Sequence, residues 1–458
     1  MSEQFNEQGG AATMDPTRLR RWMTSRLLTR LISERRLIDQ RAKTERSRIN
    51  SGKAHVVEYF HQVDDAYSHL AVQVLKPLLG CYNVQLVYHL VGGPEGDNSV
   101  EPDLLSSLAR YDSACVAAGY GLEFPRDADS PRKSLLTRAS QILAAQDSVA
   151  FTDCAADVGR ALWGNDDAGM LELSQRQGSA SISALAMRIK EGNARRAELK
   201  HYSGGMFYYG GEWYWGVDRL YHLEQRLRDL SIIKQGGKGV LIPRPEIDTT
   251  GDFPNAKSLT LEIYPSLRSP YTAVGFDAAV KLAEDTGVNL VVRPVLPMVM
   301  RGVPATREKG MYIFADAARE ARALGVPFGD FCDPIGEPIR RCYSLYPWAC
   351  EQGKGNNLIS AFLNAAFAQG INTNTKKGIR SVVESAGLDW IAAKAILGKP
   401  GWQDLVEDNR QAMYQAGLWG VPSFRLLDAS GEQLLALWGQ DRLWLIAQEI
   451  RRHSGGDC

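Results

Sequence analysis

A serine stands at a turn of this chain where an anion could be held. An apolar run, LTLEIYP at residues 259–265, leads into SLRSPYTAVGF (Ser266 to Phe276), which opens a helical pattern. Pro270 falls at the first helical position, so Ser269 is expected at the N-cap. Free backbone N–H groups and the positive end of the helix dipole stabilise an anion at such a place. The ordinary alternative is a serine that only caps its helix.

Two later segments carry groups that could face the same place. Gly420-Val421-Pro422-Ser423-Phe424 enters a predicted hairpin, and Val421-Pro422 is a candidate cis peptide that would turn the neighbouring backbone toward a ligand. Asp441 stands where the last helix begins, so its carboxylate could cap that helix or accept a ligand ammonium group. Taken singly, an ordinary turn proline and a simple cap explain these two features.

The elements that would position these residues occur twice along the chain. Residues 55–91 and 259–296 each read as strand, turn, helix and strand, and WGVDRL (215–220) is echoed by WGQDRL (438–443). Each half therefore predicts a βαβ unit, a helical insertion, a β-hairpin and a closing helix. The expected fold class is α/β, with two tandem copies of one domain.

Four parts are expected along the chain. They are a basic helical arm (1–50), a first domain (54–230), a linker rich in Gly and Pro (231–257) and a second domain (258–452). Within the arm, residues 15–49 predict one long arginine-rich helix whose apolar stripe contains Trp22, Leu27, Leu28, Leu31, Ile32 and Leu37. We expect it to pack on its own domain or on a partner subunit; contact with nucleic acid or an anionic membrane is the alternative.

Composition excludes several function classes. The 458 residues hold 53 basic and 53 acidic side chains, and a formal net charge of zero argues against a nucleic-acid partner. No apolar run approaches the roughly 20 residues that span a bilayer, and the N-terminus lacks a secretory core. We expect a cytoplasmic protein without membrane contact. Seven scattered cysteines without metal-site spacing are expected to be reduced, and with His89 and His201 isolated no metal site is expected.

A set of motifs in the second half occurs together and in a fixed order. It comprises Ser269-Pro270-Tyr271, Arg293-Pro294, Lys309 to Tyr312 with Asp316 and Arg319, Gly325 to Phe328, Gly417 to Phe424, and Trp438 to Leu443. With these motifs, residues 258–452 resemble the DsbA-family thioredoxin fold, in particular its branch of 2-hydroxychromene-2-carboxylate isomerases and kappa-class glutathione transferases. The other half would then be a DsbA-like, thioredoxin-like domain that has diverged.

The resemblance implies glutathione as the cofactor and a small conjugated electrophile as the substrate. It places Ser269 beside the thiol as the catalytic residue, and pairs the backbone of Val421, which precedes the cis Pro422, with the cysteine of the tripeptide. It assigns the γ-glutamyl end to Gln440 and Asp441, and puts Lys309 at the mouth of the site. A thiolate held in this way could add to the double bond, permit rotation and leave, or stay attached in a transferase.

This chain departs from the family at the turn and after the second strand. The turn Ser269-Pro270-Tyr271-Thr272 contains no cysteine, which disfavours dithiol oxidase chemistry. Met300-Arg301-Gly302-Val303 replaces the Gly-Asn that the isomerase branch usually carries. Arg301 is a candidate for binding a substrate carboxylate, or else a solvated loop charge.

The first half departs further. Asp65 stands where Ser269 stands, Ala66 replaces Pro270, and no proline occurs in Ser203 to Phe207. An aspartate caps a helix well but repels a thiolate. We expect this half to keep the fold without the chemistry; an activity built on His61, Asp64 and Asp65 is the less favoured alternative.

The expected function is therefore a glutathione-dependent isomerase or transferase site in the second half. One alternative is a non-catalytic interaction protein whose arm engages a partner or a second copy of the chain. Another is thiol–disulfide exchange through residues of the insertion, Cys332, Cys342 or Cys350.

Overall fold

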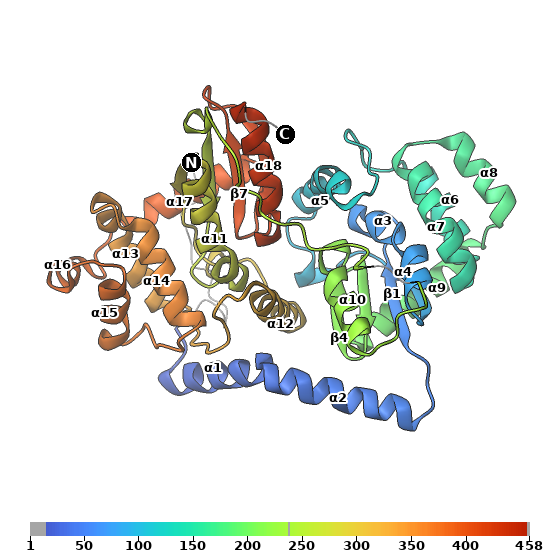
Figure 1. Ribbon diagram of the computed structural model, residues 1–458, viewed down its shortest axis with the longest axis horizontal. Coiled ribbons are helices and arrows are strands. Elements are labelled where there is room, and N and C mark those ends of the chain that lie inside the picture. Colours follow the sequence, from blue (N-terminus) through green and yellow to red (C-terminus); the bar gives the residue numbers. More distant parts are fainter. Residues whose placement is uncertain (1–14, 237–238, 456–458) are drawn as a thin grey trace. The chain divides into compact units, whose positions relative to one another are not determined.

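The chain folds into two compact units (Figure 1). The computed structural model describes residues 15–236 and 239–455. The N-terminal unit is Ile38–Pro245; the C-terminal unit combines Met1–Leu37 with Glu246–Cys458, as far as these are described. The first helix of the arm therefore belongs with the second half of the sequence. Between Ser231 and Asn255 the described residues form no helix or strand.

The N-terminal unit is built on a four-stranded sheet of order β2-β1-β3-β4. Its strands are β1 (Val56–His61), β2 (Gln85–Leu90), β3 (Met206–Tyr209) and β4 (Glu212–Trp215). The first two are parallel, and the hairpin β3–β4 adds antiparallel to β1. The helices of this unit are α3 (Ala66–Val72), α4 (Leu75–Cys81), α5 (Pro102–Ala117), α6 (Lys133–Ala144), α7 (Ser148–Trp163), α8 (Asp167–Gln177), α9 (Ile182–Glu198) and α10 (Leu220–Asp229).

The C-terminal unit has a second four-stranded sheet, of order β6-β5-β7-β8. Its strands are β5 (Thr260–Tyr264), β6 (Asn289–Val292), β7 (Ser423–Leu427) and β8 (Gln433–Trp438). Again the first two are parallel and a hairpin completes the sheet. Its helices are α11 (Pro270–Thr286), α12 (Arg307–Leu324), α13 (Glu337–Glu351), α14 (Gly355–Phe367), α15 (Lys376–Ser385), α16 (Trp390–Ile396), α17 (Trp402–Gln415) and α18 (Leu443–Ser454). The mixed α/β class is confirmed.

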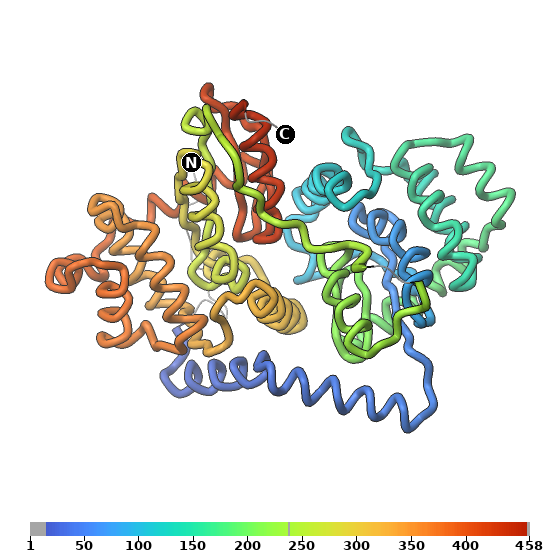
Figure 2. Tube along the Cα trace, viewed as in Figure 1, coloured from blue at the N-terminus to red at the C-terminus, as the bar shows by residue number. Residues whose placement is uncertain are grey.

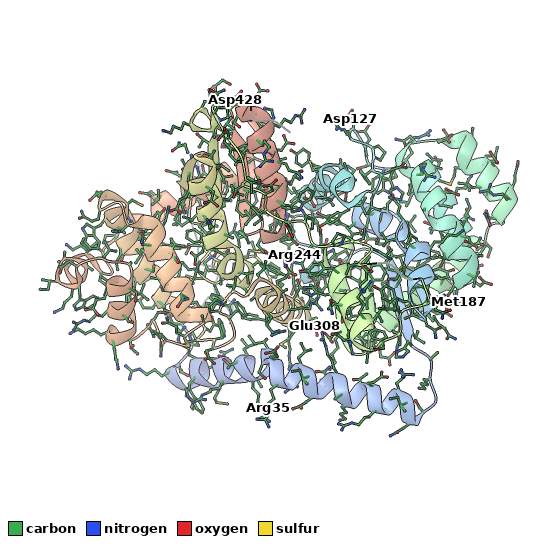
Figure 3. All side chains as sticks on the ribbon, in the orientation of Figure 1. Arg35, Asp127, Met187, Arg244, Glu308 and Asp428 are labelled. Carbon is green, nitrogen blue, oxygen red and sulfur yellow. The ribbon has the colours of Figure 1, made fainter. Side chains whose placement is uncertain are left out.

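Helix α11 is the crossover that places the candidate site. It packs against α12 and α14 of the insertion and against the closing helix α18, which runs beside it in Figure 2. Phe276 and Leu282 of α11 are buried at 1% exposure, so the helix is fixed along its length. At the far end of the unit Asp428, labelled in Figure 3, closes the β7–β8 hairpin by accepting hydrogen bonds from the backbone of Ser430 and Glu432.

Each sheet has one ion-paired glutamate in its central parallel strand, buried in one unit and partly buried in the other. Glu262 of β5 is 3% exposed and accepts a 2.6 Å hydrogen bond from Arg293, which follows β6. In the N-terminal unit Glu58 of β1 pairs with His89 of β2 at 2.9 Å. In each pair the two residues are 31 positions apart in the sequence. A buried carboxylate needs such a partner, because an unpaired charge is costly to remove from water.

The arm differs from the single amphipathic helix that the sequence predicts. It forms α1 (Arg18–Ile32) and α2 (Glu34–Asn50), and the chain leaves the helical conformation at Ser33 (ψ 140°). The side chains of α1 that are buried are Arg21, Ser25 and Ile32. Trp22 and Leu27 of the predicted stripe are 58% and 55% exposed. The packed face of α1 is thus largely polar. In α2, Arg41 pairs with Glu212 of β4 at 2.8 Å.

None of the helices in the described part of the chain is long and apolar enough to cross a membrane. The described cysteines form no disulfide with one another. Cys458, the seventh cysteine, and residues 1–14, where a targeting segment would begin, lie outside the described residues.

Candidate functional site

Ser269 connects the start of α11 to a loop 152 residues further along the chain. It is the N-cap of α11: its Oγ accepts a 3.1 Å hydrogen bond from the backbone N–H of Thr272. The same hydroxyl donates to the backbone carbonyl of Val421 at 3.2 Å. With 8% exposure, Ser269 is nearly closed off from solvent. Its one hydroxyl proton is therefore already directed at the Val421 carbonyl.

The Val421–Pro422 peptide bond is cis, and its loop is held on both sides. The Pro422 carbonyl accepts a 3.0 Å hydrogen bond from Gly439, and Ser423 Oγ donates to the Gly420 carbonyl at 2.8 Å. Val421 itself is half-buried, and its backbone N–H makes no hydrogen bond to another described residue. One backbone donor is thus available next to Ser269.

Gln440 and Asp441 lie in the short helix η6 (Gln440–Arg442), against the flank of α11. A Cβ placed on Gly275 of α11 would lie 2.6 Å from Gln440 Cβ, so the two elements are in direct contact there. Gly275 is about 9 Å along the helix from Ser269, at 1.5 Å per residue. The structure therefore gathers Ser269, Val421 and η6 around the N-terminal half of α11.

The two η6 side chains differ in what they can offer a ligand. Gln440 is 4% exposed, and its Nε2 donates a 2.8 Å hydrogen bond to Glu320 of α12, which is fully buried. The Asp441 side chain is 18% exposed and its Oδ1 lies 3.6 Å from Arg442 Nη1. Asp441 thus keeps contact with solvent, whereas Gln440 faces the protein.

Lys309 and Arg301 approach the residues just before Val421. Lys309, in the first turn of α12, is 9% exposed and its Nζ lies 5.6 Å from the centroid of the Trp419 ring. Burial lowers the pKa of Lys309. Arg301 donates to the Leu296 carbonyl at 3.1 Å and to the Trp419 carbonyl at 3.5 Å. Arg301 is therefore a contact between two loops rather than a solvated loop charge.

Two buried acids near the site were not singled out from the sequence. Asp333 accepts a two-pronged pair from Arg268, at 2.8 and 2.9 Å, and Arg268 directly precedes Ser269. Glu320, which holds Gln440, follows Asp316 by one helical turn, and Asp316 accepts a 2.8 Å hydrogen bond from Tyr271. The i, i+4 spacing on α12 could have drawn attention to Glu320. No sequence signal distinguishes Asp333.

The insertion cysteines lack the features of reactive thiols. Burial raises the pKa of Cys332 and of Cys342, and partial desolvation raises that of Cys350, whose surface is exposed. A reactive cysteine needs the opposite shift, because the thiolate is the nucleophile.

The corresponding turn of the N-terminal unit is occupied differently. Asp65 caps α3, accepting from the backbone N–H of Ser68 at 2.8 Å, and burial raises the pKa of Asp65 to about 6. His61 is 4% exposed and bonded to the Tyr59 hydroxyl, and burial lowers the pKa of His61 to about 3. Asp64 is exposed. These three side chains therefore have separate environments.

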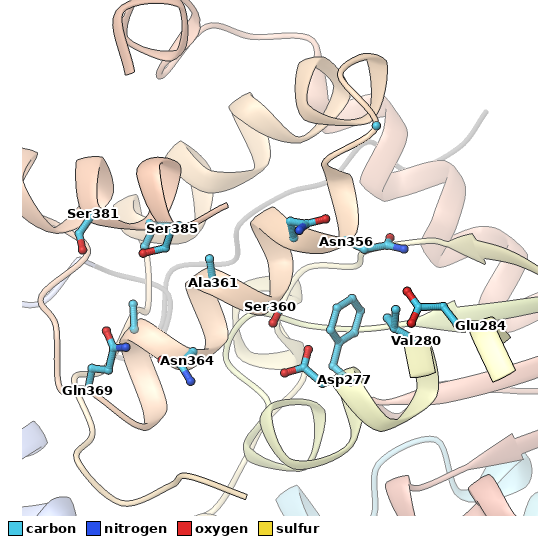
Figure 4. Close-up of a pocket in the computed structure, with 15 residues that line it drawn as sticks. Asp277, Val280, Glu284, Asn356, Ser360, Ala361, Asn364, Gln369, Ser381 and Ser385 are labelled. Atoms are coloured by element: carbon cyan, nitrogen blue, oxygen red, sulfur yellow. The ribbon is translucent and has the colours of Figure 1, made fainter. Parts of the chain in front are cut away.

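A cavity of about 520 Å³ lies along α11, with its lining residues drawn in Figure 4, and none of the predicted site residues lines it. Its wall combines Asp277 and Glu284 of α11 with polar side chains of α14 and α15, such as Ser360, Asn364 and Ser385. A cavity of about 40 Å³ shares part of that wall and reaches Ala273, one turn beyond Ser269. The sequence drew no attention to this polar groove.

Residues 260–451 match the family model of the DSBA-like thioredoxin domain. The C-terminal half is a DsbA-like thioredoxin domain. The resemblance to the DsbA family is thereby confirmed.

Several solved structures are similar to part of this chain. A "probable DsbA oxidoreductase" from Streptomyces coelicolor is 23% identical, over 44% of this chain and 92% of its own, with a TM-score of 0.35. A 2-hydroxychromene-2-carboxylate isomerase is 21% identical, over 42% and 95%, with a TM-score of 0.35. The cytosolic disulfide reductase DsbM from Pseudomonas aeruginosa, determined with GSH, is 18% identical, over 42% and 96%, with a TM-score of 0.32. No curated protein matches the chain.

Proposed function

We propose that the C-terminal unit is a glutathione-dependent isomerase or transferase of the 2-hydroxychromene-2-carboxylate isomerase type, acting on a small conjugated electrophile. The observation that carries the proposal is the position of Ser269. One hydroxyl caps a 17-residue helix and also contacts the carbonyl that precedes the cis proline. A hydroxyl and a helix N-terminus, with no cysteine at the turn, suit the binding of a thiolate that comes from a ligand.

The residues present fit a tripeptide thiol. Val421 offers a backbone N–H without a partner among the described residues and a carbonyl beside it. In this proposal the Val421 backbone pairs with the cysteine of glutathione, next to Pro422. Asp441, still partly exposed, accepts the ammonium group of the γ-glutamyl end. Gln440 assists through its carbonyl oxygen, because its amide nitrogen is held by Glu320. Lys309 stands at the mouth of the site.

Glutathione supplies the thiol that, once ionised, can add reversibly to a conjugated double bond. The chain's own contribution is to favour ionisation. In the structure the Ser269 proton is directed at the Val421 carbonyl, so pairing of that carbonyl with a ligand N–H would compete with this hydrogen bond. The hydroxyl could then turn toward the sulfur. With the N-terminus of α11, it would lower the thiol pKa from about 8.5.

Calorimetric titration of the full chain with reduced glutathione tests this proposal. We expect one equivalent to bind, with the affinity lost in Asp441→Ala. Asp408→Ala, which removes an exposed carboxylate from α17, is the matched control and should bind as the wild type does. Absence of heat and of any thermal shift at millimolar glutathione would refute the proposal. It would shift support to the non-catalytic interaction protein.

We further infer that the two units are diverged copies and that the N-terminal one has lost this chemistry. Tyr67 donates to Asp112 as Tyr271 donates to Asp316, and each pair is separated by 45 residues. These contacts join helices at equivalent places in the two units, and the sheets of the two units have the same strand order. An ionised Asp65 would repel a thiolate, so partner binding suits this unit better.

The remaining finer expectations are proposals as well. The neutral net charge supports a chain without a nucleic-acid partner, and the scattered cysteines, which form no disulfide in the described part of the chain, support a cytoplasmic location. The exposed side chains of α1, among them Trp22 and Leu27, support a contact of the arm with a partner or with a second copy.

A further inference from the structure

The polar face of α1 is bonded to one loop of the C-terminal unit. Arg21, 1% exposed, donates to the carbonyl of Asp333 and, at 2.9 Å, to that of Ile335. Ser25 Oγ accepts a 3.0 Å hydrogen bond from the backbone N–H of Asp333, and Thr29 Oγ1 accepts one from Phe331. These contacts connect positions about 300 residues apart in the sequence. They explain why α1 buries Arg21 while the apolar Trp22 and Leu27 stay exposed.

The same loop holds the turn that precedes Ser269. The Asp333 carboxylate accepts both prongs of the Arg268 guanidinium and, at 3.1 Å, the backbone N–H of Ile335. Burial by itself would raise the pKa of Asp333, but Arg268 and these hydrogen bonds, with Arg21 nearby, lower it. Asp333 is therefore a carboxylate: Arg268 binds its side chain, and the Arg21 guanidinium donates to its backbone carbonyl.

The charges that the described residues bring to this cluster do not cancel. Asp15 lies 3.5 Å from Arg21 and 2.9 Å from Arg340, so three guanidinium groups face two carboxylates. Burial raises the pKa of the neighbouring Cys332 thiol, which is therefore neutral. Glu337 and Arg341 form an ion pair with each other, so together they add no net charge. Among the residues that the structure describes, one net positive charge therefore lies behind the Arg268–Ser269 turn, and Arg21 contributes to it.

We propose that α1 is a component of the thiolate site, in which Arg21 is a positioning residue that keeps a net positive charge behind Ser269 through Asp333 and Arg268. In its role toward glutathione this inference rests on the proposed function. A unit charge roughly 10 Å away, at an effective dielectric constant of about 20 to 40, shifts the pKa of a thiol by about 0.5 to 1 unit. Removal of Arg21 should raise the pKa of a thiol at this place, and removal of the Asp333 charge should lower it.

A reporter thiol tests this without any ligand. Ser269→Cys places a thiol at the N-cap, and its pKa is measured from the pH dependence of thiolate absorbance and of alkylation rate, against the chain that retains Ser269. The measurement is repeated with Arg21→Met, Arg21→Lys and Asp333→Asn added. Arg30→Met, which removes an exposed arginine from the same helix, is the control.

We expect Arg21→Met to raise the reporter pKa by about 0.5 to 1 unit and Asp333→Asn to lower it by a similar amount. Arg21→Lys and Arg30→Met should leave it near the starting value. Arg21→Met and Asp333→Asn both break the same cluster, so a purely structural role predicts that they shift the reporter pKa in the same direction. Shifts of one sign, or no shift, would overturn the inference. If Arg21→Met does not fold, Asp333→Asn alone tests the inference: a lowered reporter pKa supports it, and a raised or unchanged one overturns it.

A second measurement separates this inference from the proposed function. The thiol pKa of bound glutathione is followed in the same variants with Ser269 in place, where the same opposite shifts are expected. If the wild type binds no glutathione, the proposed function fails while the reporter series still decides the role of Arg21. If glutathione binds and its thiol pKa is insensitive to Arg21→Met, the inference fails while the proposed function stands.

Discussion

Replacing Ser269 separates what this residue does for the fold from what it does for a thiolate. Ser269→Ala removes the cap of α11 and the hydrogen bond to the Val421 carbonyl. Loss of an N-cap costs about 1 kcal/mol, and loss of a neutral hydrogen bond about another 1 kcal/mol. We expect the free energy of unfolding of the C-terminal unit to fall by about 2 kcal/mol, with the fold retained. Ser269→Thr keeps a hydroxyl and serves as the control.

The effect on the thiol should be larger than the effect on stability suggests. A hydrogen bond to a charged group contributes about 1.5 to 3 kcal/mol, so Ser269→Ala should raise the pKa of a bound thiol by about 1 to 2 units. Ser269→Asp copies the N-terminal unit, where Asp65 caps its helix. Ionised at about 4 Å from the sulfur, that carboxylate would raise the thiol pKa by roughly 3 units.

Two assays on the same samples decide the question. Denaturant unfolding of the full chain gives the stability of each variant, and ultraviolet absorbance of the glutathione complex, followed with pH, gives its thiolate fraction. The thiolate fraction near neutral pH should decrease from wild type to Ser269→Ala to Ser269→Asp. Equal thiolate absorbance in wild type and Ser269→Ala would refute the role of the hydroxyl, whatever the change in stability.

Two further predictions follow from packing and from buried histidines. Gly275→Ala should displace η6, because the new Cβ would lie 2.6 Å from the Cβ of Gln440. We expect this variant to be destabilised by about 1 to 3 kcal/mol and to bind glutathione more weakly. Gly310→Ala is the control: no atom lies within 4 Å of its Cβ, so it should be neutral or stabilising. Thermal unfolding and calorimetry measure both, and equal effects would contradict the packing argument. Burial lowers the pKa of three histidines of the N-terminal unit to about 3 or 4; they are His61, His69 and His201. As the pH falls below about 6.5, these histidines become protonated in the unfolded chain but not in the folded unit. By about pH 5 this difference lowers the free energy of unfolding by about 2 kcal/mol for each histidine. Asp65, whose pKa is raised to about 6, stabilises the folded unit as the pH falls, but this single group opposes the effect of three histidines. Acid unfolding should therefore reach the N-terminal unit first, and unfolding of both units at one pH would contradict this.

The elements of each sheet could be predicted because local patterns determine them. Alternating and apolar runs such as 259–265 mark strands, and Ser269-Pro270 marks a helix start that the structure reproduces as an N-cap. The cis Val421–Pro422 bond was expected for the same kind of reason. The apolar stripe of the arm was misleading, because hydropathy assigns Trp22 to the packed face although it is 58% exposed. There, hydrogen bonds from Arg21 to backbone carbonyls decide the packing, and such bonds leave no apolar pattern.

The parts that sequence reasoning missed share one physical property: they are charges stabilised by partners far along the chain. Arg268 and Asp333 are 65 residues apart, and Glu320 and Gln440 are 120 apart. A motif indicates which side chain is present, whereas the protonation state of a bound thiol depends on every charge within about 10 Å, whatever its sequence position. Ser269 alone would give the same expectation in any DsbA-like domain with a serine at this turn. The surplus charge that α1 brings behind this turn is what would make the site of this chain differ from theirs.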